Sequence, residues 1–154
     1  MIRLKPLVIS LLISLGIGGL ASFLTRDSMD IYQDIILPSF APPSWLFPVA
    51  WTILYVLMGI SAYMIYESKS ELKGLALTVY ITQLIVNFIW PLLFFNGRMF
   101  LAAFICLMIL WLMVLWMISL FYKIKPLAAY MQIPYVIWLT FAAYLNWTIY
   151  TLNR

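Results

Sequence analysis

The sequence contains no histidine and only one cysteine. Zinc sites, haem sites with a histidine axial ligand, Cys–His nucleophiles and disulfide frameworks all need residues that the chain lacks. We therefore expect no metal site and no cofactor. Cys106 lies inside an apolar run, and we interpret it as a small buried hydrophobic residue.

Charge is also scarce, with 9% charged and 66% hydrophobic residues among 154. Soluble domains have about 25% charged and about 45–50% apolar residues. Nine basic and five acidic residues cannot cover the surface of a soluble fold of this size. The net charge of +4 comes from scattered residues rather than a basic stripe, so no nucleic acid is expected as a partner. This composition excludes a soluble enzyme and a disordered chain, and it places the protein in a lipid bilayer.

Five stretches are long and apolar enough to be membrane helices, which need about 20 mainly apolar residues. They cover residues 7–24, 45–66, 75–95, 99–122 and 127–152, and none of them contains Asp, Glu, Lys or Arg. The last three connections are short, so successive helices must run antiparallel. We predict an all-α integral membrane protein, a single domain of residues 1–154 that forms a five-helix bundle.

The first span follows Arg3 and Lys5, as the apolar part of a signal peptide would. Its apolar run is longer than the usual 7–15 residues and no clear A-x-A cleavage site follows, so we expect a retained helix. Ser14, Gly18 and Ser22 recur in it at four-residue spacing, which lets another backbone approach closely. These small residues predict either packing inside the bundle or the seam of a homodimer.

Lysine and arginine are divided unequally between the two ends of the predicted bundle, with six at the end that holds the N-terminus and three at the other. Because positively charged loops stay in the cytoplasm, we expect the N-terminus inside and the C-terminus outside. No amphipathic leader rich in Arg and Ser is present, which favours a bacterial plasma membrane over an organelle.

The connection at residues 25–44 is far longer than the others. Loops of this length in compact domains are usually lids, binding loops or disordered segments. Several acidic residues and Tyr32 are followed by a proline-rich run at 38–45, and proline stiffens a chain. The alternatives are a lid over a cavity and a solvated acidic loop with no task, and we favour the lid.

Aromatic rings and side-chain amides recur at helical spacing on one face of three predicted helices. The three stripes are Phe47, Trp51, Tyr55 and Met58; Gln83, Asn87 and Trp90; and Tyr135, Trp138, Ala142 and Asn146. An amide in hydrocarbon is costly unless it points inward, so the pattern fits both packing between helices and a cavity for a flat apolar ligand. Pro134 is expected to kink the fifth helix, which would widen such a cavity.

Several different short motifs occur in or next to the second, third and fifth spans. They are Pro42-Pro43-Ser44-Trp45, Phe47-Pro48-Val49-Ala50-Trp51-Thr52, Leu54-Tyr55, Met58-Gly59, Gln83-Leu84, Asn87-Phe88, Trp90-Pro91, Phe94-Phe95, Pro134-Tyr135, Trp138 and Leu145-Asn146. In order and spacing the chain resembles the translocator protein family, also called tryptophan-rich sensory proteins or peripheral benzodiazepine receptors. The resemblance covers most of the chain.

The resemblance implies a five-helix bundle, commonly a homodimer, with a cavity beneath the first loop. It implies a receptor for porphyrins such as protoporphyrin IX and for isoquinoline-carboxamide or benzodiazepine-type drugs. The ligand-binding residues that it implies are Tyr32, Pro42, Trp51, Asn87, Trp138, Ala142, Leu145 and Asn146. Light-dependent porphyrin breakdown has been attributed to some members. Trp51 and Trp138 are the candidate catalytic residues for it, because indole is readily oxidised.

Other functions find less support in the residues. Leu145, Tyr150 and Arg154 match a proposed cholesterol motif, but that pattern fits many helix ends by chance, so sterol is a less expected ligand than porphyrin. The spans hold no acid–base pair for hydrolysis. They also lack the intramembrane charges that ion-coupled carriers use. Uncoupled transport of a porphyrin or another lipophilic molecule is the alternative to a receptor.

Overall fold

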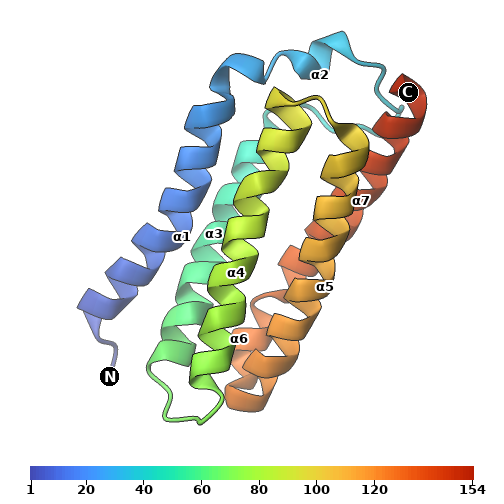
Figure 1. Ribbon diagram of the computed structural model, residues 1–154. Coiled ribbons are helices and arrows are strands. Elements are labelled where there is room, and N and C mark those ends of the chain that lie inside the picture. The colour runs from blue at the N-terminus through green and yellow to red at the C-terminus, as the bar shows by residue number, and fades with distance from the viewer.

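Five long helices form the body of the molecule in the computed structural model, which describes residues 1–154 (Figure 1). They are α1 (Leu4–Thr25), α3 (Leu46–Tyr66), α4 (Lys73–Pro91), α5 (Phe100–Ile124) and α7 (Ile133–Asn153). The chain forms no strand, and five helical segments are long and apolar enough to cross a membrane. The prediction of an all-α membrane protein with five spans is confirmed.

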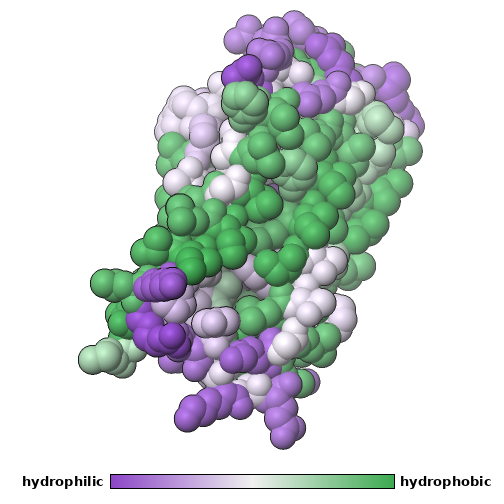
Figure 2. Space-filling view, turned by 60° about the vertical axis from the view of Figure 1, so that its left-hand side comes forward, coloured by the Kyte–Doolittle hydropathy of each residue, from purple (hydrophilic) through white to green (hydrophobic).

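Large apolar side chains cover the outside of the bundle. Leu12, Ile53, Leu112 and Ile137 are each more than half exposed. The face seen in Figure 2 has a broad hydrophobic band across its middle and hydrophilic residues at its two ends. Exposure of such an apolar surface to water is unfavourable, whereas the hydrocarbon core of a bilayer solvates it. The chain is therefore an integral membrane protein whose partner is the bilayer.

Apart from shifts of one or two residues, the helices differ from the predicted spans in three places. α1 begins at Leu4 and includes Lys5, whose long side chain can reach the aqueous interface from the first turn. α4 continues beyond Pro91 as a π-helical turn, η2 (Leu92–Asn96). The fifth predicted span is two helices, α6 (Pro126–Tyr130) and α7, which are separated at Met131 and Gln132.

Pro134 therefore lies in the first turn of α7 and does not kink a continuous helix. In that position its missing N–H is one of the groups that no helix bond would use. The side chain of Gln132 joins the break to α3: its Nε2 atom donates to Ser61 Oγ at 2.6 Å and to the Leu57 carbonyl at 3.3 Å.

α1 packs on α3 through small residues. Ser14 Oγ donates to the Tyr55 carbonyl at 2.8 Å, and Gly18 lies directly against the Tyr55 ring. The packing interpretation of this stripe is confirmed for these two residues. Gly16 and Gly19 are different, because a Cβ at either position would have no neighbour within 4 Å.

We expect Gly18→Val to destabilise the bundle by about 1–3 kcal/mol, the usual cost of overpacking. A Cβ at Gly18 would overlap the Tyr55 ring, which is held in place by its hydrogen bond to Asn87. Gly74→Val, in the first turn of α4, introduces the same side chain without a clash and is the control. The measurement is denaturant-induced unfolding in micelles, and equal losses in the two variants would contradict this packing.

Candidate functional site

Trp51 on α3 lies at the centre of a group of aromatic rings. Its ring centroid is 5.7 Å from Tyr55, 6.4 Å from Trp90 on α4, and 6.2 and 6.3 Å from Tyr135 and Trp138 on α7. These separations lie within the about 4.5–7 Å range of favourable aromatic pairs. The three predicted stripes therefore meet, and we call these five residues the Trp51 cluster.

A chain of hydrogen bonds fixes the two tyrosines of the cluster. The Tyr55 hydroxyl donates to Asn87 Oδ1 at 2.8 Å, and Asn87 Nδ2 donates to the Tyr135 oxygen at 2.6 Å. The Tyr135 hydroxyl in turn donates to Gln83 Oε1 at 2.8 Å. All four residues are buried. The amides thus satisfy their polar groups within the protein and join α3, α4 and α7.

The predicted residues farther along α7 lie in the core. Asn146 Oδ1 accepts a hydrogen bond from Trp90 Nε1 at 3.0 Å, and its Nδ2 donates to the Phe100 carbonyl at 2.9 Å. Ala142 and Leu145 are buried, each with 5% of its surface exposed. The cholesterol motif therefore does not form one continuous lipid-facing strip, because Leu145 faces inward while Arg154 is exposed.

A small cavity of about 90 Å³ lies beside Trp51, between α1, α3, α4 and the first loop. Its lining includes Gly18, Thr25, Met29, Trp51 and Asn87, but no residue of α7. Drug-sized ligands occupy pockets of about 300–1,000 Å³. The aromatic rings thus fill most of the expected hollow, and the remaining space faces α1. The lining residues of α1 were not predicted as a site, although the small-residue stripe indicated a close approach there.

One buried polar atom of the cluster has no hydrogen-bond partner. Trp138 Nε1 is buried and donates no hydrogen bond, and the ring packs between Trp51 and the Phe47 ring at 5.8 Å. A buried donor without an acceptor is rare and calls for an explanation such as a ligand or a water. No three His, Cys, Asp or Glu side chains come together as metal ligands.

Residues 26–45, which we call the lid, cross the end of the bundle and include η1 (Arg26–Ser28) and α2 (Ile31–Asp34) (Figure 1). The Tyr32 hydroxyl donates to the Pro42 carbonyl at 3.0 Å, and its ring contacts Phe47 at 5.5 Å. Partial burial raises the pKa of the Tyr32 phenol, which keeps it a donor. Through Phe47, both predicted lid residues connect to Trp138.

Two further contacts fasten the lid to the bundle. The side chain of Asn153 accepts a hydrogen bond from the Ile36 N–H at 2.8 Å and donates to the Ile36 carbonyl at 2.9 Å. Arg98 Nη2 lies 3.3 Å from Asp34 Oδ2 in an exposed ion pair. The lid therefore closes the end of the bundle through contacts that lie at the aqueous surface.

Comparisons with known proteins agree with these features. The TspO/MBR family model matches residues 8–152. Protein CrtK of Rhodobacter capsulatus is 40% identical over 124 residues, which are 79% of this chain and 78% of that protein. Tryptophan-rich protein TspO of Archaeoglobus fulgidus is 38% identical over 152 residues, 98% of this chain and 99% of its own. The human translocator protein is 29% identical over 144 residues, 92% and 85% of the two chains.

These relatives support a receptor-like role in the membrane. With a family model that matches nearly the whole length and five apolar helices around a tryptophan-rich centre, this chain belongs to the TspO/MBR family.

Proposed function

We propose that this protein is a membrane receptor that binds a porphyrin such as protoporphyrin IX at the Trp51 cluster, beneath the lid. The observation that carries the proposal is the meeting of three indole and two phenol rings from three helices, with no charged residue among them. A flat macrocycle gains about 0.5–1.5 kcal/mol from each aromatic contact beyond the burial of its area. The same apolar surfaces suit isoquinoline-carboxamide and benzodiazepine-type drugs.

Binding requires the site to open, because a cavity of about 90 Å³ cannot hold a porphyrin. α1 and the lid both border the cavity, and α1 is the least buried of the five spans. A ligand that binds only the open form of the site shifts the equilibrium between closed and open conformations toward the open one. Trp138 Nε1 then offers an unused donor to a polar group of the ligand.

The direct test is a titration of the purified protein in nanodiscs with protoporphyrin IX, followed by tryptophan fluorescence. Our proposal predicts saturable quenching at one porphyrin per chain and displacement by an isoquinoline carboxamide. Quenching that rises without saturation, or that the drug leaves unchanged, would refute the receptor site.

We expect Asn153→Ala to raise the association rate of protoporphyrin about fivefold. The variant loses both hydrogen bonds to Ile36, which at an exposed position are together worth about 1 kcal/mol. Thr151→Ala on the same helix end is the control, because Thr151 bonds only within α7, to the Thr148 carbonyl. Stopped-flow quenching measures both rates, and an unchanged rate for Asn153→Ala would exclude the lid as a barrier.

We also propose that oxygen oxidises a light-excited porphyrin at this site and that Trp51 and Trp138 mediate the radicals, since an indole that loses an electron to the oxidant regains it from the porphyrin, which is the group that is consumed. The two indole rings are 6.3 Å apart, and both would flank the bound macrocycle. We expect slower light-dependent decay of bound porphyrin in Trp51→Phe and Trp138→Phe. Rates equal to wild type, at equal amounts of bound porphyrin, would leave a receptor without this chemistry.

We further propose a homodimer in a bacterial plasma membrane, with the N-terminus in the cytoplasm. The excess of basic residues at the N-terminal end supports this orientation. The similarity to CrtK of Rhodobacter capsulatus supports a bacterial membrane. Gly16 and Gly19 leave an open surface on α1, where the helix of a second copy can approach closely.

A further inference from the structure

A second, larger cleft lies at the end of the bundle opposite the lid. Its volume is about 480 Å³, within the about 300–1,000 Å³ of small-molecule sites. It lies between α1, α3 and α4, where α1 leans away from the other two helices toward its N-terminus (Figure 1). Its apolar walls are formed by Ile9, Ile13, Ala62, Leu77 and Ile81.

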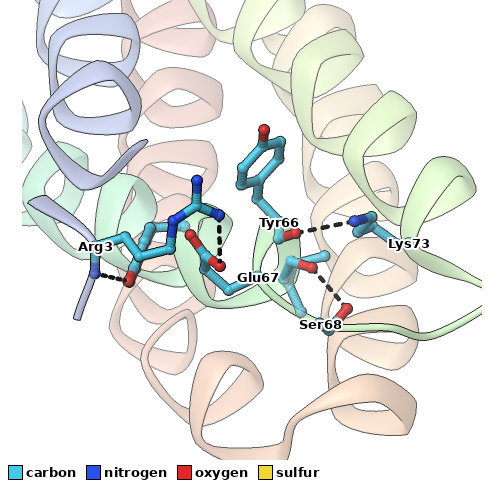
Figure 3. A network of polar contacts seen from close by, with 7 residues as sticks. Arg3, Tyr66, Glu67, Ser68 and Lys73 are labelled. Carbon is cyan, nitrogen blue, oxygen red and sulfur yellow. Dashed lines mark hydrogen bonds and ion pairs between the residues drawn. The ribbon is translucent and has the colours of Figure 1, made fainter. Parts of the chain in front are cut away.

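The mouth of this cleft is basic. Arg3 and Lys5 line it, and no acidic residue does. Arg3 is partly engaged, because its Nη1 atom lies 3.3 Å from Glu67 Oε2, a contact drawn in Figure 3. Lys5 is exposed and forms no ion pair. The mouth therefore presents a free cation at the level where a bilayer places its headgroups.

The interior holds a hydroxyl without a partner. Tyr80 lines the cleft, and only 3% of its surface is exposed, yet its hydroxyl makes no hydrogen bond. Ser14 is near it, but no hydrogen bond of standard length and angle joins the two hydroxyls, and Ser14 Oγ donates to the Tyr55 carbonyl at 2.8 Å. Tyr63 also lines the cleft, and its oxygen accepts a hydrogen bond from the Arg3 N–H at 2.7 Å. A polar group left unpaired in an apolar wall is expensive unless a ligand satisfies it.

We propose that this cleft binds one anionic phospholipid from the leaflet that faces the N-terminus. An acyl chain lies between α1 and α4 on the isoleucine and leucine side chains, and the phosphate meets Lys5 and Arg3 at the mouth. The ester carbonyls of a phospholipid lie just below its phosphate, where they are acceptors for the Tyr80 hydroxyl. Charge complementarity selects an anionic lipid over a zwitterionic one.

Spin-labelled lipids test the headgroup. The protein is reconstituted in phosphatidylcholine with a few per cent of spin-labelled phosphatidylglycerol or phosphatidylcholine, and the immobilised fraction gives their relative association constants. We expect a preference for phosphatidylglycerol that falls about fivefold in Lys5→Gln, the effect of one basic residue near the surface. Lys123→Gln, at the same end of the bundle in the last turn of α5 and outside the cleft, is the control. No preference in wild type, or equal losses in the two variants, would overturn the proposal.

Two further variants test the cleft itself. Ile81→Trp should remove the immobilised phosphatidylglycerol component, because Trp fills the space between α1 and α4. Ile81 is 43% exposed, so the bundle can accommodate the change, and Ile85→Trp, one turn farther along at 51% exposure, is the matched control. Tyr80→Phe should weaken the binding of phosphatidylglycerol without changing the free energy of unfolding. A wild-type lipid preference in both Ile81→Trp and Tyr80→Phe would place the lipid elsewhere and overturn the proposal.

Discussion

Asn87→Leu is expected to lower the free energy of unfolding by about 1–3 kcal/mol, the cost of leaving a buried hydroxyl unpaired. Asn87 holds two tyrosines at once: it accepts from the Tyr55 hydroxyl and donates to the Tyr135 oxygen. Leucine has the same number of side-chain heavy atoms with the same branching, so the loss comes from the hydrogen bonds rather than from a cavity. Unfolding in micelles measures the change.

Tyr55→Phe provides the control for Asn87→Leu through a double-mutant cycle. In the Asn87→Leu background the Tyr55 hydroxyl has lost its acceptor, so removing it should restore part of the stability. In the wild-type background the same change should destabilise the protein. If the two losses of unfolding free energy add in the double variant, the hydrogen bond between Asn87 and Tyr55 does not contribute to stability.

Trp51→Ala is expected to weaken protoporphyrin binding at least tenfold. Trp51 is the only residue in contact with all four other rings of its cluster, so its loss removes stacking surface and loosens the neighbouring rings. A tenfold change needs only about 1.4 kcal/mol. Trp116→Ala on α5, where Trp116 is 52% exposed, is the matched control and should leave the affinity unchanged. Equal affinities for the two variants, at matched folding, would exclude Trp51 from the site.

The five spans could be predicted because length and apolarity alone decide what crosses a bilayer. The break at Met131 and Gln132 could not, because it depends on a contact with another helix. Pro134 indicated a disturbance in this region, but whether the helix bends or ends is decided by Gln132, whose side chain binds Ser61 on α3. Such a partner is separated by 71 residues in sequence and leaves no local pattern.

The meeting of Trp51, Asn87 and Trp138 could be predicted from helical spacing together with the family resemblance. The position of the empty space could not, because it depends on how completely the rings pack when no ligand separates them. Asn146 shows the same limit: the sequence marks it as a buried amide, yet only the structure identifies Trp90 as its partner. Nothing in the sequence marks Tyr80 as a binding residue, since a tyrosine in an apolar span is an ordinary core residue.

The central claim is that porphyrin enters the Trp51 cluster, and fluorine NMR tests it most directly. Protein labelled with 5-fluorotryptophan gives one signal for each of its seven tryptophans, which single Trp→Phe variants assign. We predict that protoporphyrin IX shifts or broadens the signals of Trp51, Trp90 and Trp138 and leaves that of Trp116 unchanged. If Trp116 responds while the signals of Trp51 and Trp138 stay in place, the porphyrin binds on the lipid-facing surface and the proposed receptor site is wrong.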